Sequence, residues 1–208
     1  MAEIKAIIFD MGGVILRSLD YGPREAQAKR LGVSRQAMED IVFGGPTGAR
    51  ATVGACTERE HWEAVGNTFG ILPAAMPAWR QQFWAGDRMD QQLLGWLNSL
   101  RPAYTTALLS NAWPEARVSI HRNYPKALNS FDLCIFSAEV QLAKPDEHIY
   151  RLVCQRLGVK PAEAVFLDDV QENVDAAIKI GMRAIQFRDA KQALADLQGL
   201  LNGMQPGG

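Results

Sequence analysis

Short apolar runs alternate with longer amphipathic stretches along most of the chain. Five of the runs are rich in β-branched or aromatic residues and are predicted to be buried strands: Ala6–Phe9, Thr105–Leu109, Leu133–Phe136, Ala164–Leu167 and Ala184–Phe187. Amphipathic patterns separate the later runs and predict three helices: Pro114–Tyr124, Pro145–Gly158 and Gln171–Gly181. This alternation is typical of βαβ units, so the sequence predicts an α/β fold with a parallel sheet covered on both faces.

The block from Leu19 to Leu100 interrupts the alternation, because its patterns are helical only. Thr57 followed by Glu60 is a capping-box signature at the start of one of these helices. The glycine-rich stretch Phe43–Ala55 is expected to be the loosest part of the block. A helical block inserted after the first strand of a parallel sheet is typical of a lid. We therefore predict a sheet core over residues 1–18 and 101–208 and a small α-helical cap over residues 19–100.

Polar side chains follow four of the predicted strands at the point where each strand ends. They are Asp10 after the first strand, Ser110 and Asn111 after the second, Lys144 downstream of the third, and Asp168 and Asp169 after the fourth. Each alone is typical of a turn or a helix cap. In an open α/β sheet, however, ligands bind at the carboxyl ends of the strands. The joint arrival of these side chains at one edge therefore favours a functional site.

The chemistry of this set points to phosphate and a metal ion. Several carboxylates on one edge repel each other unless a cation lies between them, and oxygen ligands without His or Cys indicate Mg²⁺. Lys144 and Ser110 complement the phosphate that such a metal would bind. A carboxylate such as Asp10 can attack phosphorus and form an aspartyl-phosphate. Gly12 and Gly13 let the backbone approach a phosphate closely and offer N–H groups to it.

Four segments in order resemble the sequence motifs of the haloacid dehalogenase-like hydrolase superfamily: "IIFDMGGVI", "ALLSNA", "AKPDEHIY" and "VFLDDVQENVDAAIKIGM". The resemblance covers both ends of the chain, and the helical block lies where one subfamily carries a small α-helical cap. It implies a Rossmann-like catalytic core with an inserted cap. It also implies a hydrolase of the phosphatase or dehalogenase type.

The resemblance implies roles for the residues that handle the substrate. Asp10 corresponds to the nucleophile of the family. Lys144 would balance the charge of the nucleophile and the phosphoryl group. Ser110 would hold the phosphate with Asn111 beside it.

The same resemblance implies a magnesium site. Asp10, the backbone carbonyl of Gly12 and Asp169 would be ligands of the metal. Asp168 would be a second acidic ligand or a partner just outside the ligand shell. Asn173 lies one turn into the following helix, where the family often keeps a polar residue near the metal.

Gly12 departs from the phosphatase pattern of the superfamily, which has a second aspartate at this position as the general acid and base. Dehalogenases of the superfamily also lack that aspartate, but they have a bulky aromatic residue there and a threonine where this chain has Val14. The variant in this chain looks more like a sub-branch that includes sugar-phosphate phosphatases. A Mg²⁺-dependent phosphatase is therefore predicted. A metal-independent 2-haloacid dehalogenase and a catalytically silent binding protein of this fold stay as alternatives, and the replacement for the missing acid stays open.

The amino-acid composition excludes some classes of binding partner but indicates no further functional site. The 208-residue chain has 48% hydrophobic residues, 22% charged residues and a net charge of −1, which argues against nucleic-acid and membrane partners. Three scattered cysteines and the absence of a signal-peptide pattern predict a cytoplasmic protein. We expect a small phosphorylated metabolite as the partner and a monomer or homodimer as the assembly. The tail Asn202–Gly208 is expected to be disordered.

Overall fold

A five-stranded parallel sheet forms the centre of the computed structural model, which describes residues 2–203. Its strands follow the order β5-β4-β1-β6-β7 across the sheet. Their bounds are Ala6–Phe9 for β1, Thr105–Ser110 for β4, Leu133–Phe136 for β5, Ala164–Asp168 for β6 and Arg183–Gln186 for β7. Each predicted strand is therefore confirmed to within one residue at either end. The prediction of a parallel α/β sheet is confirmed as well.

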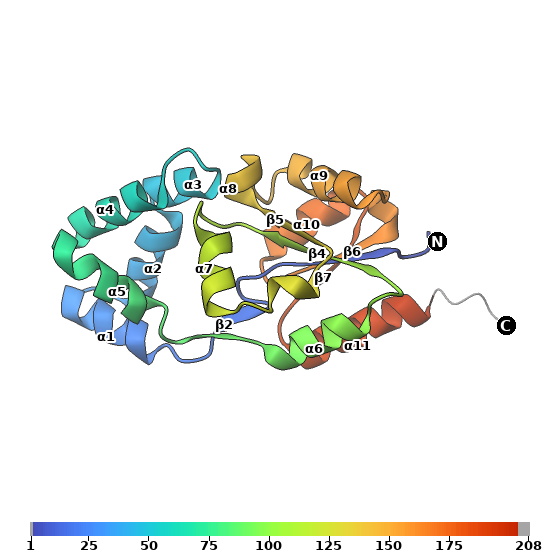
Figure 1. Cartoon of the computed structure of the whole chain (residues 1–208), viewed down its shortest axis with the longest axis horizontal. Helices are drawn as coiled ribbons and strands as arrows, with labels where there is room; N and C mark the ends of the chain where they lie inside the picture. The colour runs from blue at the N-terminus through green and yellow to red at the C-terminus, as the bar shows by residue number, and fades with distance from the viewer. Residues whose placement is uncertain (1, 204–208) are drawn as a thin grey trace.

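Helices cover both faces of the sheet (Figure 1). The second half of the chain contributes the long helices α7 (Ala116–Asn123), α9 (Glu147–Leu157), α10 (Gln171–Lys179) and α11 (Ala190–Asn202), besides the short α8 (Ser137–Val140). Alternate residues of β1 point to opposite sides, so Ile8 packs with Tyr150 of α9 while Ile7 and Phe9 pack in the cluster that contains Leu197 of α11. A fully buried apolar side chain of this size contributes about 1.5–3 kcal/mol to stability.

Five helices form a separate group beside the sheet domain, at the left of the view in Figure 1. They are α1 (Gly22–Leu31), α2 (Arg35–Gly44), α3 (Pro46–Thr52), α4 (Glu58–Phe69) and α5 (Met76–Phe83). The predicted capping box is present at the start of α4, where the Thr57 and Glu60 side chains accept hydrogen bonds reciprocally. Met38, Val42, Trp62, Val65 and Phe83 form the core of this group, which is distinct from the two clusters on the sheet.

The expectation of a loose segment at Phe43–Ala55 was wrong, because α3 occupies most of it. Pro46 occupies the first turn, where a missing N–H group costs nothing. Gly48 is buried, and a Cβ atom there would lie 2.6 Å from the Phe43 carbonyl oxygen. Glycine in this segment thus permits close packing of α3 on the end of α2.

The last helix of the predicted helical block, α6 (Gln91–Ser99), packs against the sheet and not with α1–α5. Its residues Leu93, Leu94 and Leu97 belong to the cluster that contains Phe9, and Figure 1 shows α6 beside α11. The helical group is joined to the sheet by a two-stranded antiparallel ribbon of β2 (Leu16–Ser18) and β3 (Asp87–Met89). Ser18 pairs with Asp87 in this ribbon.

Two further features are the C-terminal tail and the character of the helices. The predicted disorder of the tail concerns mainly residues 204–208, which lie outside the described range. Among residues 2–203, no helix combines the length and apolar character needed to cross a membrane.

Candidate active site

Asp10 lies directly after β1, the central strand of the sheet. Its backbone N–H donates a hydrogen bond to the carbonyl of Leu167 at 2.8 Å, which continues the pairing of β1 with β6 by one residue. The strands β4 and β6 flank β1 and run parallel to it. Ser110, the last residue of β4, and Asp168, the last residue of β6, therefore lie at the same edge of the sheet as Asp10. The strand order therefore explains why polar residues distant in sequence gather there.

Lys144 lies between two carboxylates of this edge. Its Nζ donates to Asp10 Oδ1 at 2.5 Å and to Asp168 Oδ2 at 2.6 Å, and the residue is only 5% exposed. The Asn111 side chain makes two hydrogen bonds to the Lys144 backbone. Its Nδ2 donates to the Lys144 carbonyl and its Oδ1 accepts from the Lys144 N–H, each at 2.9 Å. The Asn111 amide thus positions Lys144, and its place beside the phosphate stays a prediction.

Asp168 is fully buried and accepts hydrogen bonds at both carboxylate oxygens. The Val170 N–H donates to Oδ1 at 2.8 Å, and Asn173 Nδ2 lies 3.0 and 3.1 Å from the two oxygens. Tyr150 in turn donates its hydroxyl hydrogen to the Asn173 carbonyl at 2.9 Å. These contacts fix the Asp168 carboxylate in the orientation that binds Lys144.

Asp169 is partly exposed and lies against the glycine loop that follows Asp10. Gly13 has φ +78°, and a Cβ atom on it would lie 2.1 Å from Asp169 Oδ2. A side chain at Gly13 is therefore excluded by both backbone conformation and space. A Cβ atom on Gly12 would instead meet nothing within 4 Å.

The three carboxylates Asp10, Asp168 and Asp169 each have an oxygen within 4.8 Å of the others. Burial raises the pKa of Asp10 to about 7, with the Lys144 ammonium opposing the shift and the Asp168 carboxylate adding to it. Burial and then Asp168 also raise the pKa of Asp169. Burial acts to lower the pKa of Lys144, but the Asp10 and Asp168 carboxylates outweigh it and raise that pKa. Excess negative charge and oxygen donors fit a hard cation such as Mg²⁺.

Two residues that the sequence did not single out connect this edge to α1–α5. Trp113, in the loop after Asn111, has its ring centroid 4.4 Å from that of His61 and 5.4 Å from that of Trp62. The fully buried Ser137 donates to the Thr52 carbonyl at 2.6 Å and accepts from the Ala112 N–H at 2.9 Å. Their only sequence signal is their position just after the ends of β4 and β5.

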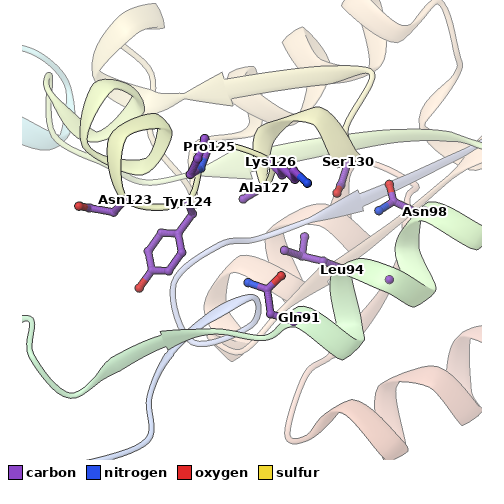
Figure 2. A pocket seen from close by; sticks show the side chains of 10 residues that line it. Gln91, Leu94, Asn98, Asn123, Tyr124, Pro125, Lys126, Ala127 and Ser130 are labelled. Carbon is purple, nitrogen blue, oxygen red and sulfur yellow. The ribbon is translucent and has the colours of Figure 1, made fainter.

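A separate hollow of about 460 Å³ lies between α6 and the segment after α7 (Figure 2). Its lining includes Gln91, Leu94 and Asn98 from α6, and Tyr124 and Lys126 from the other side. None of the site residues expected from the sequence lines it. The candidate active site is therefore the edge around Asp10.

Comparisons with known proteins agree with the geometry. A family model described as haloacid dehalogenase-like hydrolase matches residues 4–181. Bifunctional epoxide hydrolase 2 of Rattus norvegicus is 34% identical over 101 residues, which cover 47% of this chain and 18% of that protein. The matched region of this chain thus spans less than a fifth of that relative.

Two further relatives carry names of different activities. The sesquiterpene phosphatase astK of Aspergillus oryzae is 24% identical over 197 residues, with 95% of this chain and 96% of the relative covered. The (S)-2-haloacid dehalogenase 1 of a Pseudomonas species is 33% identical over 97 residues, with 45% and 41% covered.

Solved structures share the fold. A HAD family enzyme from Bacteroides thetaiotaomicron, in complex with magnesium and inorganic phosphate, superposes with a TM-score of 0.75 at 24% identity. The match covers 91% of this chain and 98% of that one.

Proposed function

Because the chain belongs to the haloacid dehalogenase-like hydrolase family, we propose that it is a Mg²⁺-dependent phosphatase of a small phosphorylated metabolite. The observation that carries the proposal is the carboxylate of Asp10 at a strand end, 2.5 Å from the Lys144 ammonium and clustered with Asp168 and Asp169. This arrangement joins a nucleophile to a fixed positive charge and to a set of oxygen ligands.

The first chemical step is attack of an Asp10 carboxylate oxygen on phosphorus. The bond from phosphorus to the leaving-group oxygen breaks, its electron pair stays on that oxygen, and a proton from solvent neutralises it. Lys144 offsets the charge on Asp10, and Asp168 holds Lys144 in place. Ser110 and the backbone N–H of Gly12 bind the phosphate oxygens, because the Gly13 N–H already donates to the Leu16 carbonyl at 3.0 Å.

The second step regenerates the carboxylate. Water attacks phosphorus and gives a proton to solvent, the bond from phosphorus to the Asp10 oxygen breaks with its electron pair returning to the carboxylate, and inorganic phosphate leaves. Asp10, Asp169 and the Gly12 carbonyl would hold Mg²⁺, which would offset the negative charge that otherwise separates phosphate and carboxylate. Asp168 orients Lys144 and is not a metal ligand in this scheme, because Lys144, Asn173 and Val170 already bind its two oxygens.

The second candidate is a 2-haloacid dehalogenase that uses Asp10 on carbon. It is favoured by Gly12, which replaces the acid and base of the phosphatases, and by the dehalogenase relative. Carbon–halogen displacement needs no metal, so it gives no reason for the clustered acidic pair Asp168–Asp169. A relative named as a phosphatase that matches over nearly its whole length supports the first candidate.

The test is phosphate release from a panel of phosphorylated metabolites with Mg²⁺ and with chelator. We expect activity with Mg²⁺ only, and its loss in Asp10→Asn, because an amide is a poor nucleophile while its size preserves the packing. Asp196→Asn, an exposed change on α11, is the matched control and should keep full activity. Wild-type rates in Asp10→Asn would refute the mechanism, and release of halide from 2-haloacids in chelator would establish the second candidate.

A further inference from the structure

A hollow of about 830 Å³ lies between α2 and the loop that follows the acidic pair. Val170, which follows Asp169 directly, lines one side of it. The other side comes from α2 and includes Gln36, Glu39, Asp40 and Phe43. The hollow thus lies between α2 and the loop that carries the acidic pair, and Val170 is the part of that loop that lines it.

Phe43 gives the hollow an aromatic surface that is held in place from behind. Its ring centroid lies 5.6 Å from that of Phe83, 5.8 Å from that of Trp84 and 6.1 Å from that of Trp113. Even so, the residue is 43% exposed, and Val170 is 47% exposed. Two large apolar side chains thus remain open to solvent on opposite sides of one hollow beside the site.

The charges around the hollow are unsuited to an anion. Among residues 2–203, its lining contains the carboxyl groups of Glu39 and Asp40 and no lysine or arginine. The cations nearest to Glu39 are already paired: Arg24 binds Glu39 and Asp87, and Arg35 binds Glu39. Because these arginines offset Glu39, the negative charge that a second phosphate or a carboxylate on the substrate would meet is that of Asp40, whose Oδ1 accepts from Gln36 Nε2 at 2.8 Å.

We propose that this hollow receives the leaving group of the substrate, and that this group is an uncharged, largely apolar alcohol. The inference rests on the proposed phosphatase function and narrows its substrate class to monophosphate esters without a further acidic group. The volume is within the range of small-molecule sites. Phe43 and Val170 bury the apolar part, while at the rim the Gln36 amide donates or accepts hydrogen bonds and the Asp40 carboxylate accepts them.

The experiment compares esters whose alcohols differ in length and charge but have similar reactivity: ethyl phosphate, hexyl phosphate and 3-phosphoglycerate. We expect kcat/KM with Mg²⁺ to rise about tenfold or more from ethyl to hexyl, because each buried methylene adds favourable transfer free energy. The value for 3-phosphoglycerate should be the lowest of the three.

Two variants assign this preference to the hollow. Phe43→Ala should reduce the ratio of hexyl to ethyl turnover by about tenfold, as is typical when an aromatic contact is removed from a binding site. Leu72→Ala, which removes an exposed apolar side chain elsewhere, is the control and should leave the ratio unchanged. Asp40→Lys, at an exposed position of α2, should raise the relative kcat/KM for 3-phosphoglycerate and covers the case that Phe43→Ala misfolds.

A binding measurement separates failure of this inference from failure of the proposed function. Hexylphosphonate and ethylphosphonate, which cannot be hydrolysed, are titrated while the tryptophan fluorescence is followed, because Trp84 and Trp113 adjoin Phe43. If hexylphosphonate binds more tightly than ethylphosphonate but no ester is hydrolysed, the phosphatase function is refuted, while the hollow is supported as an apolar binding site. Turnover of the esters with no effect of chain length, or preferred use of 3-phosphoglycerate, would overturn the hollow as the leaving-group site.

Discussion

Gly12 and Gly13 are neighbours with opposite tolerance for a side chain. We expect Gly13→Ala to lower phosphatase activity at least about 100-fold, because its Cβ atom would lie 2.1 Å from Asp169 and its φ is +78°. Gly12→Ala should stay within about threefold of the wild type, since a Cβ atom there meets nothing within 4 Å. Steady-state rates of the two variants, with folding checked by circular dichroism, test this. Equal losses in both would mean that the Asp169 contact does not matter.

The carboxylate cluster predicts a link between pH, metal and stability. The folded state raises the pKa of Asp10 to about 7, above its ordinary value of 3.8, so between these pH values the folded protein holds a proton that the unfolded chain has lost. Stability without metal should therefore fall as pH rises from about 4 to 7. Because Mg²⁺ competes with that proton, it should raise the melting temperature more at pH 8 than at pH 5.

Melting curves at both pH values, in Mg²⁺ and in chelator, measure this difference. Asp10→Asn is the control, because an amide does not titrate and should remove most of the pH dependence attributed to this residue. A Mg²⁺ effect that is larger at pH 5 than at pH 8 would contradict the assignment.

The positions of the site residues could be predicted from the sequence, whereas their partners could not. Strand ends fix where Asp10, Ser110 and Asp168 lie, and a run of apolar residues reveals each strand. That the Asn111 amide binds the Lys144 backbone depends on side-chain torsions and on the path of a loop. Neither leaves a periodic signal in the sequence.

At the scale of elements, Ser137 joins α3 to the loop after β4. Ser137→Ala would remove a buried hydroxyl and leave the half-buried Ala112 N–H and Thr52 carbonyl without this partner. We expect a loss of about 1–3 kcal/mol in the free energy of unfolding, the cost of unsatisfied buried polar groups. Urea unfolding measures it, and the exposed change Ser119→Ala should cost less than about 0.5 kcal/mol. A similar value for both variants would show that the bridge contributes nothing.

The strands of the sheet could be predicted from the sequence, whereas the short strands β2 and β3 could not. The sheet strands are continuous apolar runs because they are buried on both faces, and this makes them visible. The strands β2 and β3 have three residues each, with Arg17 and Arg88 at their centres, and show no such run. The helical pattern of α6 was visible, but periodicity shows which face of a helix is apolar and not which neighbour covers it.

At the scale of the whole molecule, Arg24 ties the helical group to the ribbon that carries it. This arginine is 6% exposed and donates from α1 to Asp87 of β3, to Glu39 of α2 and to the Phe83 carbonyl. Arg24→Met would leave Asp87 buried without its cation, which typically costs about 3–5 kcal/mol. Thermal or urea unfolding measures the loss.

A second variant decides whether charge is the cause. Asp87→Asn combined with Arg24→Met should recover part of the stability, because the uncompensated carboxylate is then absent. If the double variant is no more stable than Arg24→Met, packing of the arginine against Phe83 and its neighbours explains the loss instead.

The pairing of Ser18 with Asp87 brings the entrance and the exit of the helical group side by side. Opposed residues of an antiparallel pair lie about 5 Å apart at their Cα atoms, a gap that a short turn can bridge. The 68 intervening residues, from 19 to 86, therefore leave and rejoin the core at one place, and none of them belongs to the five-stranded sheet. A recombination event at this ribbon could give the same reactive edge a new selectivity in a single step.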